Sequence, residues 1–267
     1  FSPTIEALVG VAVMATNRPC VLVFNYHQQQ QYTGKRAPFY GTTRLCADKD
    51  GKLLAMEYDF DVDHGPYSEF GDLLTLRGNQ FIGSGYDIAN IRGEGRTICT
   101  NHAWGSAFRG YGSPQSFFMS ETTVDLLADK LGMDPLEFRY KNAYRPGATT
   151  PNGQEPDSYS FPKMFEALRP KYQAALDNAK KHSTDRHKKG VGICIGIYGC
   201  GLDGPDTSEA YAELNEDGSI TIGTAWEDHG QGADIGAITT AHEALRPMNV
   251  SPDRLRFTWP DTELHPN

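Results

Sequence analysis

Two glycine-containing stretches of the 267-residue chain carry residue types suited to holding an anionic or oxygen-rich ligand. The first, residues 106–115, reads S-A-F-R-G-Y-G-S-P-Q, and its glycines let the backbone approach a ligand closely. Ser113-Pro114 then begins a predicted helix, whose free N–H groups favour an anion. Arg109 adds a planar set of donors suited to phosphate or to the edge of a pterin. Composition also allows a glycine turn before a helix, with an arginine that is merely exposed.

The second stretch, residues 226–236, reads W-E-D-H-G-Q-G-A-D-I-G and joins a predicted strand to a predicted helix. Turns of this kind aim several backbone N–H groups at one point, which is a common way to hold phosphates. Glu227, Asp228 and His229 could instead ligate a metal, but three adjacent residues in a strand rarely converge on one ion. A helix cap and a tight turn without a ligand remain the alternative.

The composition limits the class of protein. A net charge of -9 argues against nucleic-acid binding, which requires a basic surface. The five cysteines form no C-x-x-C pair, so a zinc ribbon or an iron–sulfur cluster inside this chain is disfavoured. Their odd number favours a reducing, cytoplasmic setting over a disulfide framework. No apolar run approaches the ~18–20 residues that a membrane span needs.

The spacing of apolar residues predicts helices mixed with hairpins and therefore an α+β fold, with mixed sheets and flanking helices. Residues 66–85 read as an irregular pocket wall, and no internal repeat is evident in the sequence. The expected strands are 20–24, both sides of 48–51, 190–199, both sides of 217–218, and 255–259. The expected helices are one that begins at Ser2-Pro3 and stops before Asn17, then 113–131, a short one after Asp134, 162–181 and 234–245.

Residues 145–156 (R-P-G-A-T-T-P-N-G-Q-E-P) have the composition of a linker, since prolines and glycines interrupt both helices and strands. We therefore predict one domain over 1–146, a linker over 147–160 and a second domain over 161–267. The chain begins at Phe1 rather than methionine and stops soon after a strand-like run. We expect it to be a piece of a longer polypeptide.

Several motifs resemble the xanthine oxidase and aldehyde oxidoreductase family of molybdenum hydroxylases. N-I-R-G at 90–93, followed by A-F-R-G at 107–110 and G-M-D-P-L-E-F-R-Y-K-N at 132–142, is similar to the family pattern. Y-G-C-G-L-D-G-P-D at 198–206, together with the 226–232 stretch, resembles bacterial aldehyde oxidoreductases that carry a molybdopterin cytosine dinucleotide. The resemblance covers essentially the whole chain. It implies the C-terminal part of a first molybdopterin-binding subdomain before the linker and the N-terminal part of a second after it.

The resemblance also implies roles for particular residues. Molybdenum would be held by the pterin dithiolene and not by side chains. The implied cofactor contacts are Ala107, Phe108, Arg109, Gly110, His229, Gly230, Gln231, Gly232 and Ala233. The implied lining of the substrate funnel is Phe1, Phe70, Leu73, Tyr111, Tyr198 and Leu202, with Arg77 deeper; any of these could instead be an ordinary core residue. Phenylalanine at position 1 cannot hydrogen-bond a purine edge, which favours aldehydes over purines as substrates.

The implied reaction hydroxylates aldehydes to carboxylic acids with water as the oxygen source. The family's general-base glutamate follows a Gly-x-Gly-Glu pattern that this chain lacks, so we expect it beyond Asn267 and expect no catalytic residue here. Two [2Fe-2S] clusters would precede Phe1, and the isolated fragment should not turn over. The implied partners are the rest of the polypeptide, a second copy in a homodimer, and an electron acceptor of the ferredoxin or flavodoxin type.

Two alternatives remain. One is a purine dehydrogenase of the same family, and the other is a non-catalytic cofactor-binding fragment. Relatives that oxidise carbon monoxide rely on an active-site cysteine, and no cysteine stands beside Arg109.

Overall fold

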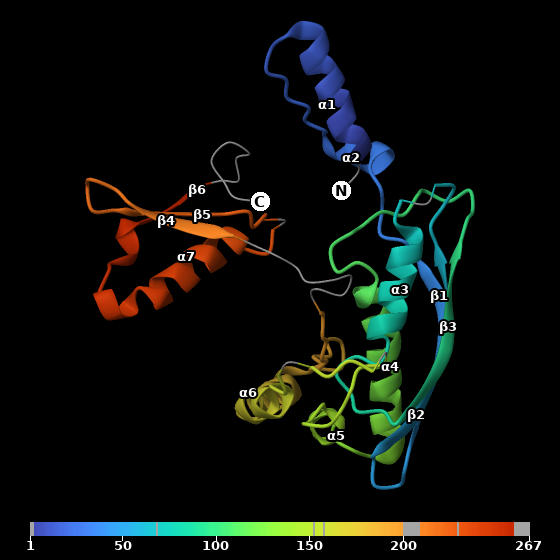
Figure 1. Cartoon of the computed structure of the whole chain (residues 1–267). Coiled ribbons are helices and arrows are strands. Elements are labelled where there is room, and N and C mark those ends of the chain that lie inside the picture. Colours follow the sequence, from blue (N-terminus) through green and yellow to red (C-terminus); the bar gives the residue numbers. More distant parts are fainter. Residues whose placement is uncertain are drawn as a thin grey trace. The chain divides into compact units, whose positions relative to one another are not determined.

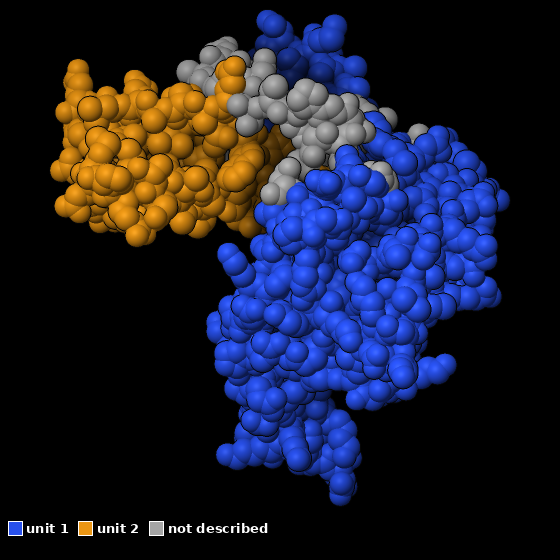
Figure 2. Space-filling view, turned by 60° about the horizontal axis from the view of Figure 1, so that its bottom comes forward, with its two compact units in different colours: residues 1–198 blue, residues 199–267 orange. Residues whose placement is uncertain are grey.

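The computed structural model describes residues 3–67, 69–151, 153–156, 158–199, 209–228 and 230–258. These residues belong to two compact units, 1–198 and 199–267, shown in different colours in Figure 2. Each unit contains a three-stranded sheet and helices, and each sheet mixes antiparallel and parallel pairs. The predicted α+β class with mixed sheets is confirmed.

The sheet of unit 1 begins with the predicted hairpin. Strands β1 (Phe39–Ala47) and β2 (Leu53–Asp63) pair antiparallel around a turn in which Gly51 has φ +81°. Strand β3 (Asn90–Ile98) then pairs with β2 in parallel. A parallel neighbour requires a crossover, and helix α3 (Gly71–Phe81) lies in it.

Helices α3 and α4 (Ser113–Leu131) pack on one face of this sheet, as Figure 1 shows. Strand β2 alternates so that Phe60 and Val62 are buried on the helix side. The core beneath the two helices therefore consists of side chains from both layers, namely Ala37, Leu53, Phe60, Val62, Leu74, Val124 and Ala128.

The prediction of an irregular segment at 66–85 was wrong, because α3 occupies most of it. Glycine is a poor helix former, and Gly71 and Gly78 hid the helix in the sequence. A Cβ on Gly78 would lie only 3.0 Å from the rings of Phe39 and Phe60. Close packing against the sheet, rather than helix propensity, stabilises α3.

Two predicted strands are absent from the described residues. Residues 20–24 are neither helix nor strand, and Val21 and Val23 are 87% and 78% exposed. Residues 190–199 also join no sheet, and the N–H and carbonyl of Ile195 bond to the side chains of Glu121 and Ser84. Strand β3 and helix α2 (Tyr26–Tyr32) were not predicted at all.

The remaining helices of unit 1 follow the sequence signals. Helix α1 spans Pro3–Thr16, α5 spans Pro135–Asn142 and α6 spans Phe161–His182. Asp134 caps α5 by accepting the N–H groups of the second and third helical residues, as predicted. Because α6 packs on α5, residues 147–160 lie inside this compact unit. The linker and the boundaries drawn from it remain predictions.

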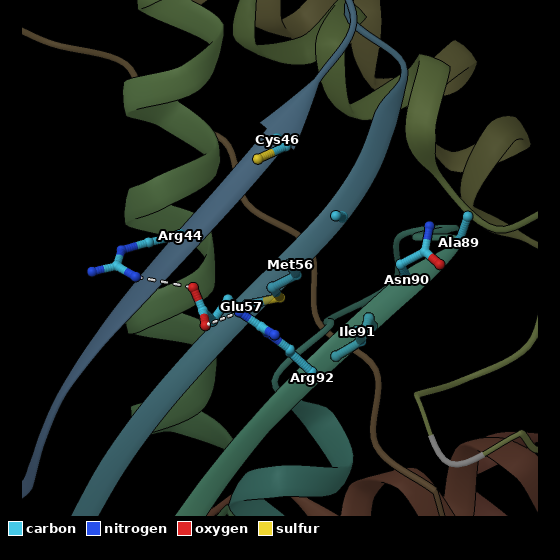
Figure 3. Close-up of a pocket in the computed structure, with 9 residues that line it drawn as sticks. Arg44, Cys46, Met56, Glu57, Ala89, Asn90, Ile91 and Arg92 are labelled. Atoms are coloured by element: carbon cyan, nitrogen blue, oxygen red, sulfur yellow. Dashed lines mark hydrogen bonds and ion pairs between the residues drawn. The ribbon is translucent and has the colours of Figure 1, made fainter.

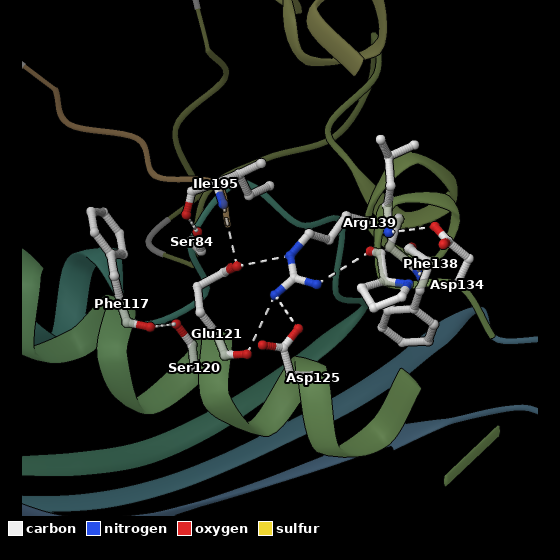
Figure 4. A network of polar contacts seen from close by, with 12 residues as sticks. Ser84, Phe117, Ser120, Glu121, Asp125, Asp134, Phe138, Arg139 and Ile195 are labelled. Atoms are coloured by element: carbon white, nitrogen blue, oxygen red, sulfur yellow. Dashed lines mark hydrogen bonds and ion pairs between the residues drawn. The ribbon is translucent and has the colours of Figure 1, made fainter. Parts of the chain in front are cut away.

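A buried ion network joins three segments of unit 1 (Figure 4). The Arg139 side chain of α5 is fully buried, and its Nε lies 2.9 Å from Glu121 Oε2 of α4. Its Nη2 lies 2.7 Å from Asp125 Oδ1, one helical turn further along α4. Glu121 Oε2 also accepts the N–H of Ile195 over 3.2 Å. Burial raises the pKa of Glu121, and the charge of Arg139 opposes that rise.

Unit 2 repeats the order of the elements β1, β2, α3 and β3 of unit 1. Strands β4 (Ala210–Leu214) and β5 (Ile220–Thr224) form a hairpin, helix α7 (Ala233–Ala244) follows, and β6 (Leu255–Thr258) pairs with β5 in parallel. The short 3-10 turns Arg246–Met248 and Pro252–Arg254 connect α7 to β6. The connection from hairpin to helix contains Asp-His-Gly in both units, at 63–65 and 228–230.

The hairpin of unit 2 turns at Asp217, as predicted from the Asp-Gly pair. The Asp217 carboxylate accepts the N–H and the hydroxyl of Ser219, over 2.9 and 2.6 Å. Arg256 of β6 donates to its other oxygen over 2.6 Å. These contacts, led by the Ser219 hydrogen bonds, lower the pKa of Asp217 to about 2. Among the described residues, no helix is long and apolar enough to cross a membrane.

Replacing Arg139 should destabilise the fold strongly. Arg139→Met leaves the Glu121 carboxylate buried without its partner, which typically costs about 3–5 kcal/mol. Urea unfolding monitored by circular dichroism measures the change in the free energy of unfolding. Arg44→Met is the matched control, because Arg44 is 78% exposed in its ion pair and such pairs contribute about 0–1 kcal/mol. Equal losses in the free energy of unfolding would contradict the prediction that the buried network contributes more than the exposed ion pair.

The Asp217 turn should confer a pH dependence on unit 2. A carboxyl whose pKa is lowered by folding stabilises the protein above its unfolded pKa and loses that effect as pH falls through the folded value. The stability gap between wild type and Asp217→Asn should therefore be widest above pH ~4 and shrink towards pH 2. Thermal midpoints measured across this range test it. A gap that does not change with pH would refute it.

Candidate functional site

The loop between β3 and α4 has an unusual backbone. Gly110, Tyr111 and Gly112 have φ values of +91°, +44° and +89°, three consecutive residues in the left-handed region. The Tyr111 N–H closes a turn on the carbonyl of Phe108 over 2.8 Å. The N–H and hydroxyl of Ser113 both donate to the Gly110 carbonyl, over 3.0 and 2.6 Å. The predicted glycine turn before a helix is therefore present, and its backbone is fixed by its own hydrogen bonds.

The loop is seated on helix α3. A Cβ on Gly112 would lie 2.6 Å from the backbone oxygen of Leu74, so only glycine permits this approach. The Tyr111 hydroxyl donates to the carbonyl of Phe70 over 3.0 Å. Phe70, at the N-cap of α3, itself has φ +60°. Backbone strain in non-glycine residues clusters at functional sites, and here it occurs on both sides of one hydrogen bond.

Helix α3 gathers most of the predicted funnel residues of unit 1. Phe70, Leu73 and Arg77 recur at helical spacing and so share one face of α3. Phe81 continues that face, and its ring stacks on Tyr198 with centroids 4.9 Å apart. Tyr111 joins this set through Phe70. The two other predicted lining residues, Phe1 and Leu202, lie outside the described residues.

The side chains of the first loop are presented at the surface. Phe108 is 48% exposed, and Arg109 is exposed beside it. Arg36, from the segment before β1, stacks on Phe108 and donates to the Arg109 carbonyl over 2.6 Å. Sequence reasoning missed Arg36, because it lies 73 residues from this partner and no local pattern connects the two.

The second loop, in unit 2, converges its N–H groups on one point. Gly230 and Gly232, with φ values of +95° and +82°, both direct their N–H groups to Asp228 Oδ1, at 2.6 and 3.4 Å. Gly232 caps α7, whose first residue Ala233 is buried. Gln231 donates its side-chain N–H to the carbonyl of Glu227 over 2.8 Å. His229 lies outside the described residues.

The loop is closed by its own aspartate. Both glycine N–H groups donate to the Asp228 carboxylate, and the N–H groups of the loop, led by that of Gly230, lower the pKa of Asp228. Among the described residues, no cluster of three histidine, cysteine or acidic side chains could hold a metal ion.

The uncovered face of the unit 1 sheet is also hollowed but shows no such donors. Figure 3 shows Glu57 of β2 between Arg44 of β1 and Arg92 of β3, at ion-pair distances of 3.0 and 2.7 Å. The two arginines lower the pKa of Glu57. Since each of these charges has a partner on the neighbouring strand, we interpret this hollow as a solvated sheet face.

Two family models of a molybdopterin cofactor-binding domain match the chain, over residues 1–143 and 167–267. The chain belongs to this family, the cofactor-binding part of the molybdenum hydroxylases, which use a molybdenum–molybdopterin cofactor. The resemblance stated from the sequence motifs is confirmed.

Individual proteins of this family differ in how similar they are to the chain. The aldehyde oxidoreductase of Megalodesulfovibrio gigas is 70% identical over 267 residues, which are all of this chain and 29% of that protein. The crystal structure of the Desulfovibrio desulfuricans aldehyde oxidoreductase matches with a TM-score of 0.84 at 62% identity, covering 100% of this chain and 30% of that one. The Mus musculus xanthine dehydrogenase/oxidase is 26% identical over 272 residues, which are 100% of this chain and 20% of that protein. The chain spans less than a third of the length of these relatives.

The seating of the first loop on α3 can be tested with two glycines. Gly112→Ala adds a methyl group that meets the Leu74 carbonyl and also forces alanine into φ +89°. Gly147→Ala is the control, because Gly147 has φ +93° but nothing within 4 Å of the added carbon. Urea unfolding should show a loss of about 1 kcal/mol for the control and of about 2–4 kcal/mol for Gly112→Ala. Equal losses would show that the close approach contributes nothing.

Proposed function

We propose that this chain is the cofactor-binding segment of a molybdenum-dependent aldehyde oxidoreductase, which converts aldehydes to carboxylic acids with water as the source of oxygen. The observation that carries the proposal is 70% identity with an aldehyde oxidoreductase across every residue of the chain. A substrate pocket and a cofactor cradle rarely keep that degree of identity while their chemistry changes.

The cofactor would be held by two loops. Ala107, Phe108, Arg109 and Gly110 contact the pterin near the metal, and Arg109 supplies the planar donor set for its polar edge. His229, Gly230, Gln231, Gly232 and Ala233 hold the pterin and its phosphates. The match of residues 167–267 to a molybdopterin cofactor-binding domain and the left-handed glycines before α7 support that assignment. We infer that the cofactor is the cytosine dinucleotide form and that its dithiolene, with no protein side chain, holds the molybdenum.

The substrate funnel would be built on α3. Phe70, Leu73, Tyr111 and Tyr198 present apolar or aromatic surface to an aldehyde, with Phe1 and Leu202 completing the lining. Arg77 lies further along the same helix face and offers a positive charge to the carbonyl side of the substrate or to the carboxylate product. The Tyr111–Phe70 hydrogen bond links the funnel to the pterin loop, so one contact positions both.

The chain's own residues bind, orient and shield, and the bound cofactor supplies the two-electron oxidation. We infer that the general-base glutamate lies beyond Asn267 and that two [2Fe-2S] clusters precede Phe1. The relatives' greater length leaves room for both. We further propose a cytoplasmic homodimer that passes electrons to a ferredoxin- or flavodoxin-type acceptor.

A purine dehydrogenase is the competing function, because xanthine dehydrogenases align with this chain at 26% identity. Phenylalanine at position 1 disfavours it, since this residue cannot hydrogen-bond the edge of a purine ring. The two candidate enzymes would therefore share one cofactor but oxidise different substrates.

The proposal is tested on the full-length parent protein. Elemental analysis should find stoichiometric molybdenum, and acid hydrolysis should release cytidine monophosphate. Turnover of a benzaldehyde-type substrate should exceed turnover of xanthine by at least about tenfold in kcat/KM, because Phe1 offers no hydrogen bond to a purine edge. Intact protein that lacks molybdenum would overturn the family role. Preferred oxidation of xanthine would overturn only the substrate.

A further inference from the structure

The segment before β1 runs alongside the proposed pterin loop. Residues 34–37 lie against residues 104–106, and the main chain of Lys35 both donates to and accepts from this second segment, each over 2.9 Å. A Cβ on Gly34 would overlap the side chain of Ser106. This close pairing of two backbones places Arg36 beside the loop that begins at the next residue, 107.

The Arg36 side chain holds two consecutive residues of that loop. Its guanidinium carbon lies 4.6 Å from the centroid of the Phe108 ring, which is the geometry of a cation–π contact. Its Nη2 donates to the Arg109 carbonyl over 2.6 Å, and hydrogen bonds from a charged donor are among the stronger ones. One side chain therefore fixes a ring and a carbonyl in the loop that we propose contacts the pterin.

The burial of Arg36 costs free energy. Its Nη1 is buried and has no hydrogen-bond partner among the described residues, and desolvation lowers the pKa of the guanidinium. Gln115, from the first turn of α4, donates to the carbonyl of Ala37 over 2.9 Å, while its own Oε1 is buried without a partner. Unsatisfied polar atoms of this kind concentrate where function rather than stability selects the residue.

We propose that Arg36 is a positioning residue: it holds the Phe108 ring and the Arg109 carbonyl in the conformation with which loop 107–110 contacts the pterin. This inference rests on the proposed function of that loop. Arg36 orders the loop before the cofactor binds. A loop that is already ordered loses less conformational freedom on binding, and this favours retention of the cofactor. Its effect should therefore appear in cofactor retention as well as in turnover.

The test compares Arg36→Gln with Arg44→Gln in the full-length parent protein. Arg44 is a matched control, since it precedes the loop in the same unit but makes only an exposed ion pair with Glu57. Molybdenum and released pterin are measured per folded polypeptide after gel filtration. Arg36→Gln should lose cofactor about tenfold faster, and kcat should fall about 10- to 100-fold with KM within about twofold, because misplacement of a reacting group affects the chemical step. Arg44→Gln should match wild type.

A double-mutant cycle asks whether Arg36 acts through Phe108. When two residues act as one unit, the second substitution costs little once the first is made. Arg36→Gln combined with Phe108→Leu should therefore reduce retention by less than the product of the two single effects. Effects that multiply would show that Arg36 does not act through the ring and would refute that part of the proposal, which would leave only the hydrogen bond to the Arg109 carbonyl.

The remaining outcomes separate this inference from the proposed function. Wild-type parent protein without molybdenum refutes the proposed function itself. Wild type that holds molybdenum, with Arg36→Gln behaving like Arg44→Gln, refutes only the role of Arg36. If Arg36→Gln fails to fold, Arg36→Lys decides: lysine keeps the charge but not the planar face, so retention between those of wild type and empty protein supports the proposal and full retention overturns it.

Discussion

The buried charge of Arg139 is the interaction on which unit 1 depends. It ties α5 to α4 through two carboxylates, and one of these, on Glu121, also receives the backbone of Ile195. Helix α4 begins at the loop that we propose contacts the pterin, and the 190–199 segment includes Tyr198. The network thus holds α4, α5 and the 190–199 segment to one another. Its value is specificity of arrangement, since apolar side chains would pack with less directional preference.

Both proposed cofactor loops obtain their shape from backbone conformation rather than from ligand-like side chains. Residues 110–112 in unit 1 and the two glycines at 230 and 232 in unit 2 adopt left-handed conformations just before a helix begins. In both loops backbone N–H groups are bonded within the loop, to the carbonyls of Phe108 and Gly110 in unit 1 and to the Asp228 carboxylate in unit 2. The backbone of each loop is therefore fixed by its own hydrogen bonds.

The sequence predicted the parts of the fold that depend on local signals. The Asp-Gly hairpins, the Asp134 cap and the Gly-rich turns before α4 and α7 follow from residues adjacent in the chain, and the structure contains them. Features set by distant packing were missed. In helix α3, Gly78 lies against the rings of Phe39 and Phe60, and in 190–199 the backbone groups of Ile195 bond to side chains of Ser84 and Glu121, which are distant in the sequence. The sequence did not indicate Arg36 either, because its contacts are with residues more than 70 positions away. The roles assigned to the loop residues remain predictions.

One order of elements occurs in both units. The hairpin β1-β2, helix α3 and parallel strand β3 of unit 1 correspond to β4-β5, α7 and β6 of unit 2, and Asp-His-Gly follows the hairpin in each. In both, the aspartate accepts the N–H of the glycine two residues later, over 3.1 Å at Asp63 and 2.6 Å at Asp228. The same contact between an aspartate carboxylate and a glycine N–H therefore shapes the start of the crossover in both units, although the residues that follow it differ.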